Sequence, residues 1–173
     1  YFIIGLDNLN DYYDINLKKA RLKELTDYAQ KHLKNIDLFL FLKTGIEDKE
    51  SLKSVFKKYN IDYVINLAAQ AGVRYSIENP FKYLESNVIG FFNILELSKE
   101  FKVKHLIFAS SSSVYGDTKL FPVKENLKLK PKNLYAKTKI KNENDAKNYF
   151  KNYRKKLIGL RFFTVYGEWG RPD

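Results

Sequence analysis

The chain has 173 residues, 45% of them hydrophobic and 16% aromatic, so it can bury one substantial core and a single domain is expected. It has no cysteine, which excludes disulfides, thiolate metal sites and a cysteine nucleophile and suits a cytoplasmic protein, and no apolar run of about 18 residues predicts a membrane span. The formal net charge of +11 would suit a polyanion, but no aromatic-basic cluster accompanies the spread lysines, so no nucleic-acid binding is expected.

Apolar runs of strand length alternate with amphipathic stretches of helical length, which is typical of a parallel sheet covered by helices. The expected fold class is α/β, a doubly wound, Rossmann-like parallel sheet. In chain order we predict a strand at Tyr1–Leu6, a helix from Ile15 to about Leu33, a strand at Asp37–Leu42, a helix at Lys49–Tyr59, a strand at Tyr63–Leu67, a helix at Phe81–Phe101, a strand at His105–Ala109, a helix from about Tyr135 to Tyr153, and a strand at Leu157–Phe162.

Asp7 follows the first strand, where a carboxylate can accept hydrogen bonds from the adenosine ribose of NAD, although a strand-ending Asp is as often a helix cap. The glycine-rich phosphate loop that should precede such a residue by about 20 positions is not in the chain. The strand before that loop lies at the centre of such a sheet. We therefore expect an N-terminally truncated piece of a longer protein, with two unpaired strand edges.

Small residues follow the third strand, in the run from Asn66 to Ser76, and they would let a flat ring or a pyrophosphate approach the backbone. Hydroxyl residues, from Ser110 to Ser113, follow the fourth strand and end in Val114-Tyr115-Gly116. Ligands bind at the carboxyl ends of parallel strands, so these hydroxyls are candidates for substrate contact. The alternative is a serine-rich turn that satisfies its own backbone.

Tyr135 and Lys139 are four residues apart on a predicted helix, so both side chains lie on one helical face. A phenol has an ordinary pKa of about 10 and needs a nearby cation to act as a base near neutral pH, which Lys139 could provide. Aromatic and lysine residues at this spacing are also common on solvated helix faces. His32 and His105 are isolated, and no metal site is expected.

Together these segments resemble the extended short-chain dehydrogenase/reductases that act on nucleotide sugars. The resemblance rests on a serine in a segment ending Val-Tyr-Gly, then Tyr-x-x-x-Lys, then Arg-x-Phe-x-x-x-Tyr-Gly, in this order over the whole chain. It implies a dinucleotide-binding domain over residues 1–162 and the start of a substrate-binding region over residues 163–173.

Within this class, three stretches are similar to the UDP-glucuronate 4-epimerases: the run from Asp7 to Tyr13, the run from Gln70 to Ser76, and RFFTVYGEWGRPD at the end of the chain. The related dehydratases usually carry an Asp-Glu pair where Ser112 and Ser113 stand. The UDP-galactose epimerases usually have Asn where Thr164 stands. Both differences favour epimerisation of a uronate.

The resemblance implies a role for each matched residue. Ser111, Tyr135 and Lys139 would be catalytic. The implied NAD-binding residues are Asp7, Asn8, Ile46, Leu67, Ala68, Ala69, Gln70, Asn87, Ser110, Tyr135 and Lys139. The implied substrate-binding residues are Ser111, Ser112, Ser113 and Thr164. One position departs from the pattern, because Gly45 replaces an Asp that contacts adenine in many relatives, so one acceptor would be lost.

The implied function is NAD-dependent epimerisation at C4 through a 4-keto intermediate, from UDP-glucuronate to UDP-galacturonate. The alternatives are epimerisation of UDP-glucose or UDP-N-acetylglucosamine, a related dehydratase, and a non-catalytic NAD-binding module. The expected partners are a UDP-sugar and a second copy of the chain, bound through the helices near residues 81–101 and 135–153. We expect this polypeptide alone to be inactive, so the function belongs to its parent protein.

Overall fold

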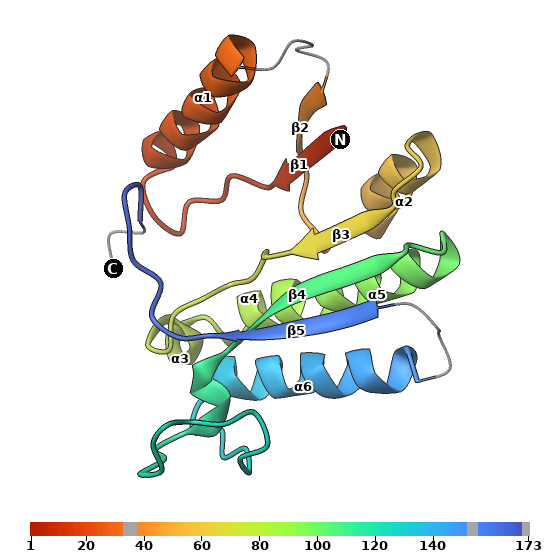
Figure 1. Cartoon of the computed structure of the whole chain (residues 1–173). Coiled ribbons are helices and arrows are strands. Elements are labelled where there is room, and N and C mark those ends of the chain that lie inside the picture. The colour runs from red at the N-terminus through yellow and green to blue at the C-terminus, as the bar shows by residue number, and fades with distance from the viewer. Residues whose placement is uncertain (33–37, 152–155, 171–173) are drawn as a thin grey trace. The chain divides into compact units, whose positions relative to one another are not determined.

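The computed structural model describes residues 1–32, 38–151 and 156–170, without the side chain of Lys156 (Figure 1). The chain forms two compact units, one of Tyr1–Gly45 with Val165–Asp173 and one of Ile46–Thr164. Among the predicted elements and segments, the positions of Leu33, Asp37, Tyr153 and residues 171–173 lie outside the described residues. The predicted division after residue 162 stays a prediction.

The first unit contains a two-stranded parallel sheet and one helix. Strand β1 (Ile3–Asp7) pairs with β2 (Phe39–Lys43), and helix α1 (Ile15–His32) lies between them in the chain. The carboxylate of Asp14 accepts a hydrogen bond of 2.8 Å from the amide of Asn16, which satisfies a donor that the first helical turn leaves open. Strand β1 extends one residue further than predicted, so Asp7 is the last residue of the strand rather than the first residue after it.

The second unit contains a three-stranded parallel sheet in the order β3 (Tyr63–Asn66), β4 (His105–Ser111), β5 (Lys156–Phe162). Its longer helices are α2 (Lys49–Lys58), α5 (Phe91–Glu100) and α6 (Leu134–Tyr149). This alternation confirms the predicted α/β class with parallel strands. Among the described strands, only β4 pairs on both edges, and β1, β2, β3 and β5 each pair on one edge.

One face of the β3–β4–β5 sheet carries the core. Phe91 of α5 packs on Phe108 of β4 with ring centroids 5.0 Å apart, and Leu106 on the same face of β4 is buried. The opposite face presents exposed apolar side chains, among them Ile65 of β3, which is 64% exposed, and Leu160 of β5. In Figure 1, α4, α5 and α6 run along this sheet. The candidate site therefore lies between the strand ends and the helices of the covered face.

The predicted helix at Phe81–Phe101 is wrong as a single α-helix. The segment contains α4 (Pro80–Tyr83), a π-helix η2 (Leu84–Gly90) and α5, and a short helix α3 (Tyr75–Glu78) precedes it. Asn87 lies within the π-helix and makes three side-chain hydrogen bonds to residues outside it. Such wider turns occur frequently at functional sites. None of the described helices is long and apolar enough to cross a membrane.

Strand β4 is longer than predicted. It was expected to end at Ala109, but Ser110 pairs with Arg161 and Ser111 with Phe162, so two serines belong to the strand. Serine alone does not favour strands, and the pairing with β5 is what extends the ladder. The turn after β4 is a 3-10 helix, η3 (Ser112–Tyr115).

The glycine that ends this turn adopts a backbone conformation that other residues avoid. Gly116 has φ 64° and ψ −148°, and a Cβ atom there would meet the carbonyl oxygen of Lys130. We expect Gly116→Ala to lower the free energy of unfolding by about 1–3 kcal/mol, the usual cost of such strain. Gly5→Ala is the matched control, because a Cβ there makes only ordinary contacts, the nearest at 3.4 Å. Equal urea midpoints for both variants of the complete gene product would contradict this expectation.

Candidate active site

Helix α6 presents Tyr135 and Lys139 toward the end of β4. Asn133 caps the helix, because its side chain accepts a hydrogen bond of 2.8 Å from the amide of Ala136. Lys139 is only 2% exposed, and its Nζ donates to the carbonyl oxygen of Ala109 at 2.8 Å. Burial lowers the pKa of Lys139 from 10.5 to about 8. The helix therefore holds a desolvated ammonium group directly against the strand.

The Tyr135 ring lies near both this ammonium group and a second tyrosine. Nζ of Lys139 is 5.8 Å from the centroid of the Tyr135 ring, and the Tyr83 ring meets Tyr135 edge-on with centroids 6.3 Å apart. Tyr83 is fully buried, and its hydroxyl donates to the carbonyl oxygens of Ala71 and Gly72. Tyr83 thus connects the loop after β3 to the ring of Tyr135.

Asn87 holds the same loop to helix α6. Its Oδ1 accepts from the amide of Gln70 at 2.8 Å, and its Nδ2 donates to the carbonyl oxygen of Gln70 at 3.0 Å and to Oγ1 of Thr138 at 3.1 Å. Thr138 in turn donates to the carbonyl oxygen of Tyr135 at 2.7 Å. A chain of buried and part-buried hydrogen bonds therefore runs from the loop after β3 to the backbone of Tyr135.

The serine cluster is ordered by its own hydrogen bonds. Ser111 is the N-cap of η3, and its Oγ accepts from the amide of Ser113 at 3.2 Å. The two hydroxyl oxygens of Ser111 and Ser113 are 3.1 Å apart and hydrogen-bonded. Ser112 is half-buried. This arrangement leaves hydroxyl groups at the carboxyl end of β4, where they can exchange a proton with a neighbouring oxygen.

Two charged residues that the sequence analysis did not assign lie beside this cluster. Glu143 of α6 pairs with Arg161 of β5, and the Glu143 carboxylate also accepts from Oγ of Ser110 at 2.5 Å. Tyr115, at the end of η3, accepts a hydrogen bond of 3.0 Å from Nη1 of Arg161. The one signal in the sequence was the position of Arg161 in the Arg-x-Phe pattern, and Glu143 had none.

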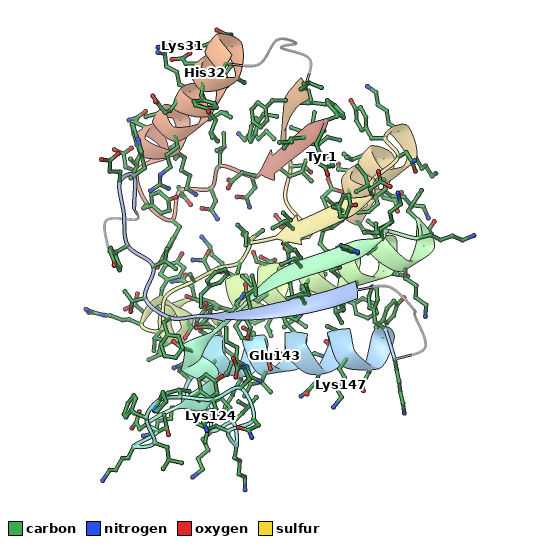
Figure 2. All side chains as sticks on the ribbon, viewed as in Figure 1. Tyr1, Lys31, His32, Lys124, Glu143 and Lys147 are labelled. Atoms are coloured by element: carbon green, nitrogen blue, oxygen red, sulfur yellow. The ribbon has the colours of Figure 1, made fainter. Side chains whose placement is uncertain are left out.

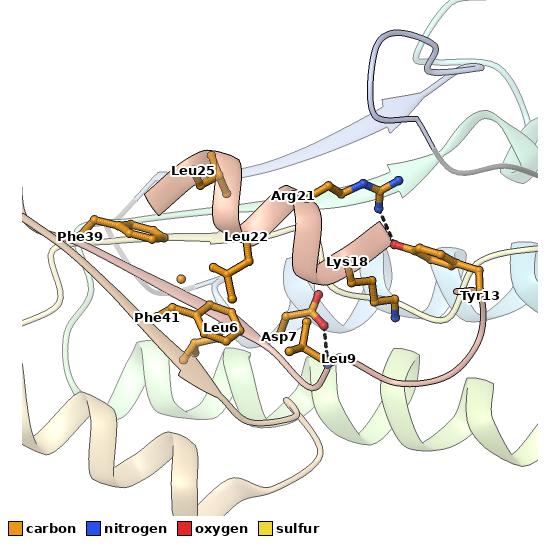
Figure 3. A pocket seen from close by; sticks show the side chains of 11 residues that line it. Leu6, Asp7, Leu9, Tyr13, Lys18, Arg21, Leu22, Leu25, Phe39 and Phe41 are labelled. Carbon is orange, nitrogen blue, oxygen red and sulfur yellow. Dashed lines mark hydrogen bonds between the residues drawn. The ribbon is translucent and has the colours of Figure 1, made fainter. Parts of the chain in front are cut away.

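The first unit has a cavity of about 230 Å³ beside Asp7 (Figure 3). Apolar residues line one end, and Asp7, Tyr13, Lys18 and Arg21 lie together at the other. Oδ1 of Asp7 accepts from the amide of Leu9 at 2.6 Å. Burial lowers the pKa of Lys18, while the charge of Asp7 opposes this shift. The polar end of the cavity therefore holds a carboxylate and two cationic side chains, at the carboxyl end of a parallel strand.

The predicted site residues fall into three groups. Three pairs of predicted residues are in contact: Tyr135 with Lys139, Ser111 with Ser113, and Gln70 with Asn87. Ser110 contacts Glu143, which was not predicted. The carbonyl oxygen of Ile46 already accepts one hydrogen bond, from Asn93 at 3.0 Å. Asp7 and Asn8 belong to the first unit. Within the described part of the chain, no contact bears on a role for the remaining predicted residues, which are Leu67, Ala68, Ala69, Ser112 and Thr164.

Each unit, taken by itself, carries groups that suit part of a dinucleotide. In the first unit, Asp7 offers a carboxylate of the kind that receives ribose hydroxyls. In the second unit, Lys139 offers a buried cation beside a phenol. Ala68 and Ala69 after β3 leave the backbone accessible. Over residues 1–32, 38–151 and 156–170, no group of three or more His, Cys, Asp or Glu residues could hold a metal ion.

Parallel strands, crossover helices and a Tyr–Lys pair at the strand ends define the dinucleotide-binding fold of the short-chain dehydrogenase/reductases. The model of the family described as GDP-mannose 4,6 dehydratase matches residues 5–172, and the chain therefore belongs to this family of NAD-dependent epimerases and dehydratases. This result confirms the resemblance found in the sequence.

Named relatives and a solved structure are consistent with this family assignment. The protein CapI of Staphylococcus aureus is 48% identical over all of this chain and 49% of its own length. UDP-glucuronate 4-epimerase 4 of Arabidopsis thaliana is 46% identical over 99% of this chain and 38% of its own length. A structure of UDP-glucuronic acid 4-epimerase from Bacillus cereus, in complex with UDP-glucuronic acid and NAD, has a TM-score of 0.85 at 32% identity and covers 100% of this chain and 52% of that one. The chain thus spans about half the length of these relatives or less.

Proposed function

We propose that the complete gene product carrying this chain is an NAD-dependent nucleotide-sugar 4-epimerase that interconverts UDP-glucuronate and UDP-galacturonate. The observation that carries the proposal is the buried Lys139 ammonium beside the Tyr135 ring, at the carboxyl end of β4. A desolvated cation beside a phenol stabilises the phenolate and turns tyrosine into a base near neutral pH. Relatives named as UDP-glucuronate 4-epimerases support the same reaction.

The residues of the chain would move one proton and hold the sugar. Tyr135 would take the proton of the sugar 4-hydroxyl and later return it to the same oxygen, after the 4-keto sugar has turned its other face to the nicotinamide. NAD, when bound, supplies a reversible hydride acceptor at the nicotinamide ring. Lys139 would keep the Tyr135 oxygen anionic until it takes this proton, and would favour the phenolate again once the proton has been returned. Ser111 would donate a hydrogen bond to the sugar oxygen as it gains and loses carbonyl character.

The serine and threonine hydroxyls would hold the uronate carboxylate. Ser111 and Ser113 are already ordered by their mutual hydrogen bond, and Ser112 and Thr164 carry the other candidate hydroxyls. The 4-keto form of a uronate is a β-keto acid, which loses carbon dioxide when its carboxylate turns out of the ring plane. Hydrogen bonds that fix the carboxylate near that plane would therefore protect the intermediate.

Elimination of water fits the site less well than epimerisation. A dehydratase needs an additional acid and base, and in this chain Ser112 and Ser113 stand where an acidic pair is usual. Glu143 does not replace that pair. Burial would raise its pKa, but the hydrogen bonds from Arg161 and Ser110 and the charge of Arg161 together lower it. Glu143 is therefore a poor proton donor at neutral pH.

The decisive measurement compares UDP-glucuronate, UDP-glucose and UDP-N-acetylglucosamine as substrates of the complete gene product. We expect kcat/KM to favour UDP-glucuronate by about 100-fold or more, because hydroxyls placed for a carboxylate are left unpaired by a neutral sugar. Thr164→Val should narrow the preference. A preference for a neutral sugar would contradict the proposed substrate, and tight NAD binding without turnover would indicate a non-catalytic binding module.

The homodimer also stays a proposal, and one surface supports it. Exposed apolar side chains follow α4, η2 and α5, including Phe81, which is 76% exposed, Ile89 and Phe92. The exposed face of α6 carries Lys137 and Lys141 instead. Like charges would repel across a symmetric helix pair, so the α4–η2–α5 face is the better-supported half of the expected interface. The expected cytoplasmic location stays a prediction.

A further inference from the structure

A partly buried ion pair lies one helical turn beyond Lys139. Nε and Nη2 of Arg161 donate to the two carboxylate oxygens of Glu143 at 2.9 and 2.7 Å, and both side chains are only 18% exposed. This two-bond geometry fixes direction as well as distance. Glu143, labelled in Figure 2, comes from α6, and Arg161 comes from β5, so the pair joins the helix to the sheet.

The same pair also holds the segment that carries the serine cluster. Oγ of Ser110 donates to the Glu143 carboxylate, and Ser110 is paired with Arg161 across β4 and β5. Nη1 of Arg161 donates to the Tyr115 hydroxyl at 3.0 Å and to the carbonyl oxygen of Glu125 at 2.8 Å. One guanidinium group therefore contacts α6, the end of η3 and the loop that follows it.

Helix α6 is thus anchored to β4 at two consecutive residues. Lys139 bonds to the carbonyl oxygen of Ala109, and Glu143 bonds to the hydroxyl of Ser110. Tyr135 lies one turn before the first anchor, and Ser111 follows directly after the second. Any shift of α6 along β4 would change the separation of these two groups.

We propose that the Glu143–Arg161 pair is a positioning device for the reaction, which sets the helix bearing Tyr135 against the strand end bearing Ser111. The inference rests on the proposed function and adds two residues to it. Neither residue needs to touch the substrate, so both are positioning residues rather than catalytic ones.

Stability alone is a poor explanation for the pair. Replacing a buried ion pair by apolar residues is often neutral or stabilising, because removing two charges from water is costly. The hydrogen bonds to Glu143 lower its pKa, so the pair persists through the neutral range. A displacement of about 1 Å between reacting groups costs on the order of 100-fold in rate, which makes a rigid anchor valuable to an enzyme.

The test uses Glu143→Gln and Arg161→Lys in the complete gene product. Glu143→Gln keeps the shape of its side chain and Arg161→Lys keeps the positive charge, but each variant breaks the two-bond pair. We expect kcat per NAD-loaded molecule to fall about 10- to 100-fold at 25 °C, with NAD content and KM within about threefold of wild type. The acid limb of the kcat/KM profile should move to higher pH, because Lys139 would stabilise the Tyr135 phenolate less well. The double variant should lose no more than the worse single variant.

Asp145→Asn is the matched control, because it breaks an exposed ion pair with Lys141 on the same helix. If the pair served only stability, the variants would melt earlier, yet their kcat and pH profile would match wild type, and the inference would be overturned. If Glu143→Gln does not fold, Tyr115→Phe decides, with a loss of about 3- to 10-fold expected and wild-type kcat refuting the inference. An inactive wild-type enzyme would instead refute the proposed function.

Discussion

Replacing Tyr135 with phenylalanine should reduce kcat of the complete gene product by about 100- to 10,000-fold, the usual contribution of a general base. The substitution removes one oxygen and keeps the ring that packs edge-on against Tyr83. Nothing else in that packing needs to change. NAD should therefore remain bound in the variant, which absorbance of the released nucleotide after denaturation would measure.

Tyr149→Phe is the matched control for this loss. Tyr149 is on the same helix, and its ring contacts Phe92 edge-on at 5.7 Å, so the same atom is removed far from the cluster around Lys139. We expect wild-type turnover from the control. Turnover of Tyr135→Phe within about threefold of wild type would exclude Tyr135 as the base, because such a change is far below the contribution expected of a general base.

Much of the fold could be predicted because its strands are short apolar runs between amphipathic stretches. All five strands occur, each within about two residues of its expected bounds where the chain is described. The local sequence pattern is less informative where pairing with another strand decides how far a strand extends. The serines Ser110 and Ser111 join β4 because β5 lies beside them, and no property of the serines themselves indicates this.

The π-helix could not be predicted for a similar reason. The segment Leu84–Gly90 has the periodicity of an ordinary helix, and its wider turn accompanies the bonds of Asn87 to Gln70 and Thr138. These partners are 17 and 51 residues away in the sequence. Long-range side-chain bonds of this kind leave no local signal.

The candidate site likewise has a part that could be predicted from the sequence and a part that could not. The Tyr135–Lys139 pair was visible because both residues lie within one helical turn. Glu143 continues the same helical face one turn later, but by sequence it is one of 20 acidic residues on a lysine-rich chain. Its role depends on Arg161, which reaches it only after β5 has paired with β4. Sequence therefore indicated the reacting groups better than the residues that hold them.

Replacing Lys139 with methionine should raise the stability of the folded protein at neutral pH and lower its activity. Lys139 is 2% exposed, and burial lowers its pKa from 10.5 to about 8. Below pH 8 the folded protein must bury the charge, at a cost of about 3 kcal/mol from that shift. Above pH 8 the folded state loses this proton before the unfolded state does, so the cost disappears as pH rises toward 10.5. Methionine carries no such cost at any pH, but it leaves the carbonyl oxygen of Ala109 without its donor, worth about 1 kcal/mol.

The difference in unfolding free energy between Lys139→Met and wild type should therefore change sign with pH. With NAD removed, we expect the variant to be more stable by about 2 kcal/mol at pH 7 and less stable by about 1 kcal/mol near pH 10.5, while its turnover falls about 100-fold or more. Lys137→Met, at an exposed position on the same helix, should show neither effect. A difference that stays constant from pH 7 to 10.5 would mean that Lys139 is not held as a desolvated ammonium group. The cation proposed to activate Tyr135 would then need another source.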